Sequence, residues 1–269
     1  MKVVYLNPFL KKFQKLKNKK VLLIAFIAFL FGLSFYLSLP QHIYTLAADQ
    51  NRLVPIYYVD TPEKTVAISF DACWGADHTP KILKTLKDHG IKTTFFLTGY
   101  WLEKYPDMVK RISDDGHEIG NHTYTHPHHN KHSEAGVRKE IERTHQLIKE
   151  ISGQEANLFR PPFGEYSNKV IQTIEGCGYK VIQWSIDSLD WKEIGKDALV
   201  KRVTEGLHEG AIVLFHNNGQ YTAEALPEII EYFKEEGYEI VPISELIYQH
   251  NYYIDPHSGA QKKSISSDN

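Results

Sequence analysis

From Thr65 onward the chain alternates between short apolar runs rich in β-branched residues and longer amphipathic stretches, and this alternation restricts its fold most. Helix-like stretches separate the runs, so neighbouring strands are expected to be parallel and joined by right-handed crossovers. Several amphipathic stretches end at glycine, as is common after a helix. The expected strands are 65–70, 93–97, 118–120, 158–159, 181–184, 211–215 and 239–241, and the expected helices are 79–89, 105–114, 133–151, 167–176, 197–208 and 222–236.

Two α/β architectures fit this order of elements: an open doubly wound sheet and a β/α barrel. The body of the chain has a length sufficient for one domain with its own core. Its composition is ordinary for a globular protein and excludes disordered and fibrous classes. We therefore expect one α/β domain over residues 64–250, followed by a polar tail, 251–269, that is frayed.

The N-terminal segment carries a targeting signal. Val21–Leu39 is a run of 19 residues without a charge, and a helix of that length spans roughly 29 Å, about one hydrocarbon core. Residues 1–20 carry seven lysines and no acid, which predicts a cytoplasmic N-terminus and an exported body. The expected order is a basic cytoplasmic segment (1–20), a transmembrane signal anchor (21–39) and a linker (40–63).

A cleaved signal peptide is the alternative, because small residues near Ala47 and Ala48 offer a cleavage site. The length of the apolar run favours an anchor in the cell membrane, and cleavage would give a secreted protein. Of the 31 basic residues, 24 lie outside the lysine-rich segment, against 33 acidic ones, a formal charge of -9. Such a body is not typical of a nucleic-acid binder. Cys73 and Cys177 lie in this body, and both a disulfide and two buried thiols stay open.

Polar residues of catalytic type follow five of the expected strands. Because the carboxyl ends of parallel strands gather at one edge of the sheet or barrel, these residues are expected to share one mouth. They are Asp71, Asn121 with His122, Arg160, Asp187 with Asp190, and His216.

His122 and His126 are four residues apart, a spacing at which two imidazoles can reach one cation. Neutral imidazole suits Zn²⁺ and related divalent metals, and a catalytic site needs a third protein ligand. Either Asp71 or Asp77 could ligate while the other acts as a base, although Asp77 could instead cap the next helix. Further histidines nearby are competing ligands: His128, His129 and His132.

Five ordered motifs now carry a family resemblance. They are Ser69-Phe70-Asp71, His122-Thr123-Tyr124-Thr125-His126, Arg160-Pro161-Pro162-Phe163-Gly164, Asp187-Ser188-Leu189-Asp190-Trp191 and Leu214-Phe215-His216. Over residues 64–248 the chain resembles the polysaccharide deacetylases with a NodB-homology domain, carbohydrate esterase family 4. The resemblance implies a distorted (β/α)7 barrel and a divalent metal held by an Asp-His-His set, with zinc expected and cobalt as an alternative.

The resemblance also implies residue roles. Asp71 would be the general base that activates water, and His216 the general acid that protonates the leaving amine. His122 and His126 would be metal ligands. The supporting and pocket residues implied are Arg160 beside Asp71, Asp190 beside His216, and Trp191, Leu214, Pro162 and Phe163 around the substrate.

One position departs from the family pattern. The usual motif has two adjacent aspartates, the second a metal ligand, and here the second place is Ala72. Our interpretation is that Asp77 takes over as ligand. A water or substrate oxygen in that place, or weak metal binding, are the alternatives.

The expected function is metal-dependent N-deacetylation of a cell-wall polysaccharide, with peptidoglycan favoured over a chitin-like glycan because the exported body would lie next to a bacterial wall. Whether N-acetylglucosamine or N-acetylmuramic acid is the substrate stays open. The alternatives are a deacetylase fold that binds glycan without turnover, and a polysaccharide O-acetyl esterase. A glycosidase that pairs Asp71 with Asp187 or Asp190 is less favoured, because it would not need the two histidines.

Overall fold

The computed structural model describes residues 24, 26–31, 33–34 and 52–264, and the chain divides into two units, Met1–Arg52 and Leu53–Asn269. The described residues of the first unit before position 52 are helical. Over the described residues, no helix combines the length and apolar character that crossing a membrane requires. The basic segment 1–20 lies outside the described residues, as do much of the expected anchor 21–39 and most of the linker 40–63.

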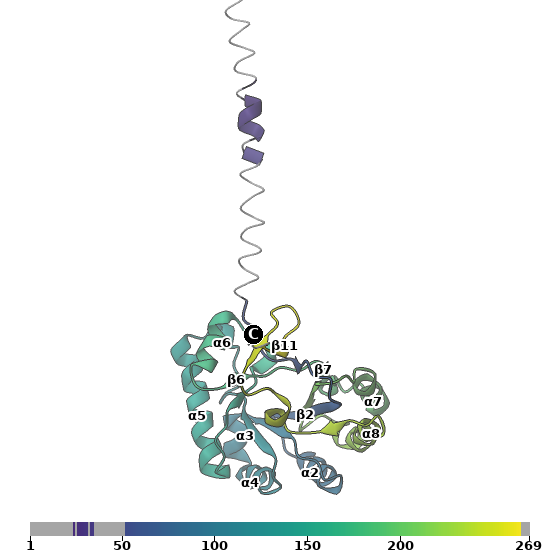
Figure 1. Ribbon diagram of the computed structural model, residues 1–269. Coiled ribbons are helices and arrows are strands. Elements are labelled where there is room, and N and C mark those ends of the chain that lie inside the picture. Colours follow the sequence, from purple (N-terminus) through teal and green to yellow (C-terminus); the bar gives the residue numbers. More distant parts are fainter. Residues whose placement is uncertain (1–23, 25, 32, 35–51, 265–269) are drawn as a thin grey trace, which may run out of the picture. The chain divides into compact units, whose positions relative to one another are not determined.

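The second unit is an α/β fold built on a curled sheet whose described strand pairs are all parallel (Figure 1). The strand order is β6-β5-β4-β3-β2-β8-β7, with β9 paired to β2. The strands are β2 (Thr65–Ala72), β3 (Thr94–Leu97), β4 (Glu118–Asn121), β5 (Leu158–Phe159), β6 (Lys180–Val181), β7 (Ile186–Asp187), β8 (Ile212–His216) and β9 (Glu239–Ile240).

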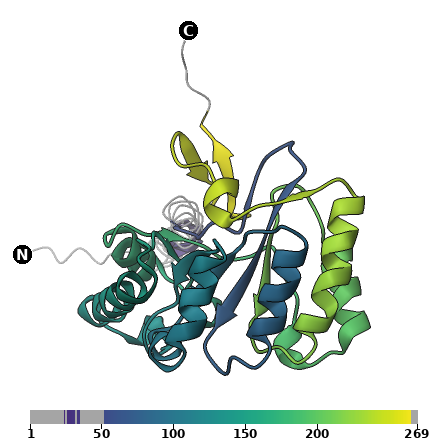
Figure 2. The same ribbon diagram turned by 90° about the horizontal axis from the view of Figure 1, so that it is seen from below.

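Helices surround the sheet on its outer side (Figure 2). Ser133 and Ser167 begin two of them, because each hydroxyl accepts a hydrogen bond from a backbone N–H three residues on. Gly153 ends the longest of the described helices in the left-handed conformation, at φ 75°. The helices are α2 (Thr79–Asp88), α3 (Gly99–Lys104), α4 (Pro106–Asp114), α5 (Glu134–Ser152), α6 (Asn168–Glu175), α7 (Lys196–Glu205), α8 (Thr222–Glu235) and α9 (Ile243–Leu246).

The central strand β2 is buried on both faces, as expected for a parallel sheet covered by helices. Val66, Ile68 and Phe70 pack into the larger core, which contains helix residues such as Leu83 and Phe233. Ala67 belongs to the second core, on the opposite face of the strand. Side chains alternate along a strand, so Ser69 and Asp71 lie on the face of Ala67.

The curled sheet agrees with the expected barrel type, and its two edges do not meet. In the described second unit no ladder joins β6 to β7. Instead Ile56 bridges Ile182 and Tyr58 bridges Ala211, so the segment that enters the domain contacts both sides of the opening.

The tail is more ordered than expected. Residues 252–263 contain two antiparallel strands, β10 (Tyr252–Ile254) and β11 (Ala260–Lys263), and β11 pairs in parallel with β1 (Tyr58–Val59). The Gln261 side chain exchanges hydrogen bonds with the backbone of Tyr248, at 2.8 Å each. The polar composition was a poor guide because backbone pairing, together with burial of Ala260, Gln261 and part of Ile254, orders the segment.

Candidate active site

The polar residues that follow the strands come together at one end of the sheet. Asp71 on β2 is the register partner of His216 on the adjacent strand β8. Asn121 at the end of β4 pairs with Phe159, which directly precedes Arg160. The strand ends that carry Asp71, Arg160 and His216 therefore lie close together, whereas the Asn121 amide turns away and donates to the Ile141 carbonyl and the Tyr179 hydroxyl.

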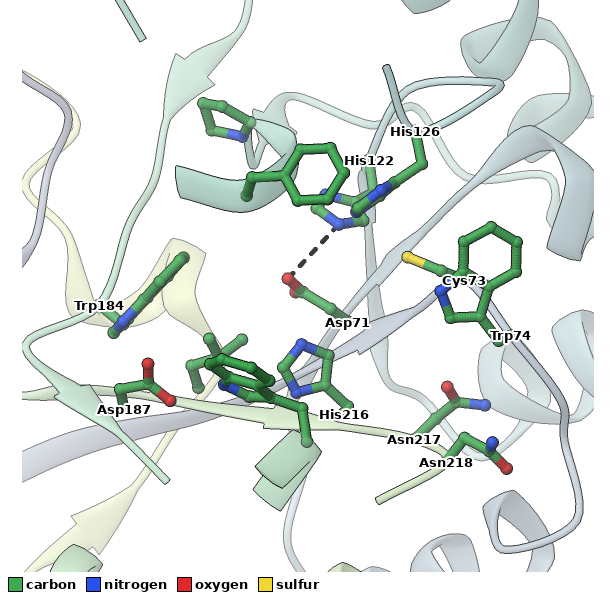
Figure 3. A pocket seen from close by; sticks show the side chains of 14 residues that line it. Asp71, Cys73, Trp74, His122, His126, Trp184, Asp187, His216, Asn217 and Asn218 are labelled. Atoms are coloured by element: carbon green, nitrogen blue, oxygen red, sulfur yellow. Dashed lines mark ion pairs between the residues drawn. The ribbon is translucent and has the colours of Figure 1, made fainter. Parts of the chain in front are cut away.

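Asp71, His122 and His216 line a cavity of about 490 Å³ together with side chains from other segments (Figure 3). Its wall combines acidic, imidazole, thiol and aromatic groups. The lining residues are Asp71, Cys73, Trp74, His122, His126, Pro161, Phe163, Trp184, Asp187, Trp191, Leu214, His216, Asn217 and Asn218.

Asp71 and Arg160 form a buried ion pair at the base of the cavity. Arg160 Nη1 donates to Asp71 Oδ1 at 2.7 Å, and Nη2 donates to Ser69 Oγ at 2.9 Å. Burial alone would raise the pKa of Asp71, but the Arg160 charge, with His122 and His216, outweighs it and lowers that pKa. Asp71 is therefore an ionised carboxylate at neutral pH.

His122 is oriented by its backbone surroundings. Its Nδ1 lies 2.7 Å from the carbonyl oxygen of Arg160, to which it donates, and Nε2 lies 3.5 Å from Asp71 Oδ2 (Figure 3). This pattern leaves the Nε2 lone pair facing the cavity, as in metal-ligating histidines.

The loop from His122 to His126 has a strained backbone. Thr123 and His126 have φ values of 72° and 56°, in the left-handed region that non-glycine residues rarely adopt. Strain of this kind persists where surrounding contacts over-determine it, and it often marks functional sites. Here Glu140 Oε2 accepts hydrogen bonds from the backbone N–H of Tyr124 at 3.0 Å and of Thr125 at 2.7 Å.

The two imidazoles are held close together and neutral. The ring centroids of His122 and His126 are 4.9 Å apart. Burial lowers the pKa of both, and for His126, with His122 nearby, it lowers the pKa to about 3. Neutral imidazole is the form that binds metals.

His216 lies beside Asp71, on the adjacent strand β8. Its Nδ1 donates to Asp190 Oδ1 at 2.7 Å, and Thr222 Oγ1 donates to the other carboxylate oxygen at 2.7 Å. Burial by itself would lower the pKa of His216, but the hydrogen bond and charge of Asp190, with Asp71, raise it. The arrangement favours a protonated imidazole close to neutral pH.

One group in the described part of the chain fits a metal ion. The ligand atoms of Cys73, His122 and His126 lie within 4.8 Å of one another, a spacing that a single ion can bridge. Asp77, expected as the third ligand, is solvent-exposed and belongs neither to this group nor to the cavity wall. The structure therefore does not bring Asp77 to the histidines. His128, His129 and His132 are also outside the group.

The expected pocket residues are mostly in place. Leu214 is buried in the wall, while Trp191 and Phe163 are exposed at the rim. Pro162 is buried in the turn Pro162–Gly164 and does not line the cavity, so this prediction is wrong, and Pro161 occupies the wall instead. Cys73 and Cys177 are both free thiols, which answers the disulfide question.

Sequence reasoning missed several contributors. Glu140 lies in the middle of α5, and no motif marks it. Trp184 lines the cavity and lies 5.6 Å from the Arg160 guanidinium, measured to its ring centroid. Its place as the last residue of the expected strand 181–184 is the signal that could have identified it.

Comparisons with known proteins agree with this site. Residues 58–182 match the family profile described as "Polysaccharide deacetylase". A peptidoglycan-N-acetylmuramic acid deacetylase of Bacillus subtilis is 34% identical over 197 residues, 72% of this chain and 75% of the relative. A peptidoglycan-N-acetylglucosamine deacetylase of Bacillus cereus is 36% identical over 185 residues, 67% of each chain.

A solved structure adds a different kind of relative. A CE4 family pseudoenzyme from Bacillus anthracis has a TM-score of 0.70 and 36% identity, covering 72% of this chain and 68% of its own. A mutant of that pseudoenzyme with restored enzymatic activity has the same TM-score at 37% identity, covering 72% of this chain and 71% of its own. The neighbourhood of this chain thus contains both enzymes and a protein that has lost activity.

Proposed function

The chain belongs to the polysaccharide deacetylase family, whose members are metal-dependent, and we propose that its cavity hydrolyses the N-acetyl groups of peptidoglycan. The observation that carries the proposal is that a base and an acid lie together in the cavity. Asp71, whose pKa is lowered, is an ionised carboxylate next to His122, and His216, whose pKa is raised, lies on the adjacent strand. Amide hydrolysis needs this combination of base and acid.

Asp71 acts as the general base in this proposal. It takes a proton from the water that attacks the acetamide carbonyl. Arg160, which is fully buried, keeps the carboxylate charged and fixes its direction through the 2.7 Å hydrogen bond. A base held in this way does not need to reorganise when the reaction begins.

His216 acts as the general acid. An amine is a poor leaving group, so the C–N bond breaks only as the nitrogen receives a proton. Asp190 holds Nδ1 of His216 and stabilises the charged ring, which leaves Nε2 to deliver that proton. The products are acetate and a free amino group on the sugar.

His122 and His126 would hold the divalent ion, and imidazole ligands favour zinc, with cobalt as a substitute. When bound, such an ion polarises the carbonyl and lowers the pKa of water. Leu214, Trp184 and Trp191 give the neighbouring wall an apolar surface on which the acetyl methyl group can pack.

The test is acetate release by the metal-loaded full-length protein. Intact peptidoglycan, chitooligosaccharides and O-acetylated xylan should be compared, with Asp71→Asn as the inactive control. We expect release from peptidoglycan and its loss in the variant. Mass spectrometry of the digested product then identifies whether N-acetylglucosamine or N-acetylmuramic acid has lost the acetyl group. Release from the xylan alone would instead establish an O-acetyl esterase.

A glycan-binding protein without turnover is the second candidate. Ala72 stands where the family has a metal-binding aspartate, and a pseudoenzyme is among the similar structures. This candidate predicts that the protein sediments with peptidoglycan but releases no acetate at any metal concentration.

For the location of the enzyme, we propose that the charge-free run Val21–Leu39 anchors it in the cell membrane with the catalytic domain outside. The measurement is fractionation of cells that express the full chain. Extraction of the protein from membranes only by detergent, together with its digestion by protease added outside intact protoplasts, supports the anchor. Recovery of a shortened chain in the medium would establish cleavage.

A further inference from the structure

We infer that Cys73 supplies, as a thiolate, the third protein ligand of the metal site, in the place where the family pattern has an aspartate. The inference deepens the metal site on which the proposed function rests. It concerns this chain's own departure from the pattern at Ala72 and Cys73.

The register of β2 explains why the ligand moves by one residue. Ala72 is fully buried and belongs to the same core as Ile68 and Phe70, on the helix-facing side of the strand. Cys73 follows directly after the end of β2, and its side chain lines the cavity together with that of Asp71. Figure 3 shows the Cys73 sulfur pointing into the cavity toward the two imidazoles.

The backbone around Cys73 is fixed on both sides. The carbonyl of Ala72 accepts a hydrogen bond from the Thr98 backbone N–H at 3.1 Å. The carbonyl of Gly75 accepts from Trp101 Nε1 at 2.6 Å and from Asn217 Nδ2 at 2.9 Å. A thiol on so short a tethered segment is preorganised, which is what a metal ligand requires.

The two nearby aspartates, Asp71 and Asp77, are less well placed than Cys73 to be the third metal ligand. Among described His, Cys, Asp and Glu side chains, the group whose ligand atoms all lie within 4.8 Å contains Cys73 and neither Asp71 nor Asp77. Asp71 is already bonded to Arg160, so a cysteine ligand leaves it free to act as a base. Three protein ligands with an open fourth position are the general arrangement of catalytic zinc sites, and both thiolate and imidazole serve as ligands there.

Thiolate coordination has chemical consequences. When the ion binds, the S–H bond breaks, the proton passes to the solvent, and sulfur donates an electron pair to the ion. Soft sulfur favours zinc and cobalt over magnesium and manganese, which prefer oxygen ligands. The site should therefore prefer zinc and cobalt over magnesium and manganese more strongly than a site made of carboxylate and imidazole ligands does.

The test is a Co²⁺ titration of the metal-free full-length protein, followed by absorption spectroscopy. A cobalt–thiolate bond gives a near-ultraviolet charge-transfer band that imidazole and carboxylate ligands do not give. We expect one Co²⁺ per chain with this band, displaced by Zn²⁺ and not by Mg²⁺. Cys73→Ser should lose the band and weaken binding by more than the roughly 10-fold that loss of a supporting residue costs.

Matched variants separate ligand loss from misfolding. Cys73→Asp should bind one Co²⁺ without the band, and Cys177→Ser and Asp77→Asn should match the wild type. Circular dichroism must show each variant folded. A folded wild type that binds no Co²⁺ or binds it without the band would overturn the inference, and so would wild-type affinity in Cys73→Ser.

Acetate release measured on the same samples distinguishes the two proposals. If the band is present but peptidoglycan releases no acetate, the ligand assignment stands and the proposed function fails. If acetate is released by a protein without the band, the function stands and the ligand assignment fails.

Discussion

Arg160 and Asp71 form an ion pair in which the arginine is 0% and the aspartate 5% exposed, with Nη1 and Oδ1 2.7 Å apart. A buried carboxylate is costly without a partner, whereas the pair together is roughly balanced. The guanidinium carbon also lies 4.1 Å from the ring centroid of Phe96, so its burial is supported by more than charge. Arg160 therefore contributes to the reaction indirectly, by positioning the Asp71 carboxylate and keeping it charged.

Replacing Arg160 by methionine should therefore damage both stability and activity. The change leaves Asp71 buried without its cation, and we expect a loss of about 3–5 kcal/mol in the free energy of unfolding. Adding Asp71→Asn should restore most of this stability but none of the activity. Chemical denaturation of the single and double variants measures the coupling. Equal destabilisation in both would mean that Arg160 acts only through packing.

Asp190→Asn should move the alkaline limb of the kcat/KM profile to lower pH. Asp190 raises the pKa of His216 above its usual 6.5, and the acid must be protonated, so activity falls as pH rises through that raised pKa. Without the carboxylate charge we expect the limb to move by about one unit or more. Because the pKa of His216 is higher in the folded than in the unfolded protein, the His216–Asp190 pair also stabilises the fold. This stabilisation is fully present below pH 6.5 and is lost as the pH rises through the pKa of His216 in the folded state. An unmoved limb would remove His216 from the role of acid.

Gly99→Ala should disturb the loop from His122 to His126, although Gly99 is not part of that loop. A Cβ at this position would lie 1.9 Å from Cδ2 of Tyr124, which is between the two histidines, and the ring is 4% exposed and cannot easily move. Overpacking of this kind costs about 1–3 kcal/mol, and we expect weaker metal binding with a lower Tm. Gly136→Ala is the control, because its nearest neighbour would be 3.4 Å away and alanine favours a helix. Similar metal affinity in both variants would contradict the prediction.

The fold was largely predictable because hydrophobic period and glycine punctuation are local signals. All seven expected strands and six expected helices exist, with ends shifted by a few residues. The missed strand β7 has two residues, and α3 has six, too few to show a period. The ordering of β11 depends on a partner, Tyr58–Val59, that is about 200 residues away in sequence.

The site was predictable wherever a residue lies at or just past the carboxyl end of a strand, as Asp71, His122, Arg160 and His216 do. The expectation for Asp77 failed because nearness to Asp71 in the sequence does not determine where a side chain points. Position 73, directly after β2, lines the cavity, whereas position 77 does not. The hydrogen bonds from the His122–His126 loop to Glu140 on helix α5 could not be predicted from the sequence, because only the tertiary structure brings the two segments together.

Glu140→Ala should weaken metal binding without moving the pH profile. Oε2 of Glu140 accepts from two backbone N–H groups and, at 3.1 Å, from the Thr125 hydroxyl, so it holds the strained loop between the two histidines. Loss of such a support typically costs about 10–100-fold in metal affinity. The control is Glu150→Ala, an exposed acid on the same helix α5. A pH shift with unchanged affinity would instead assign Glu140 an electrostatic role.

Phe163→Ala should raise KM for long glycans with little change in kcat. The side chain is 57% exposed at the cavity rim, and its backbone is held at φ 59°. Its ring centroid lies 4.3 Å from that of His128 in a stacked pair and 4.5 Å from that of His126. An exposed aromatic surface kept in an unfavourable backbone conformation is explained if a sugar ring packs on it. Steady-state kinetics on short and long oligosaccharides should show the KM effect growing with length. A fall in kcat that is independent of length would place Phe163 in support of His126 instead, and metal titration of the same variant would then show weaker binding.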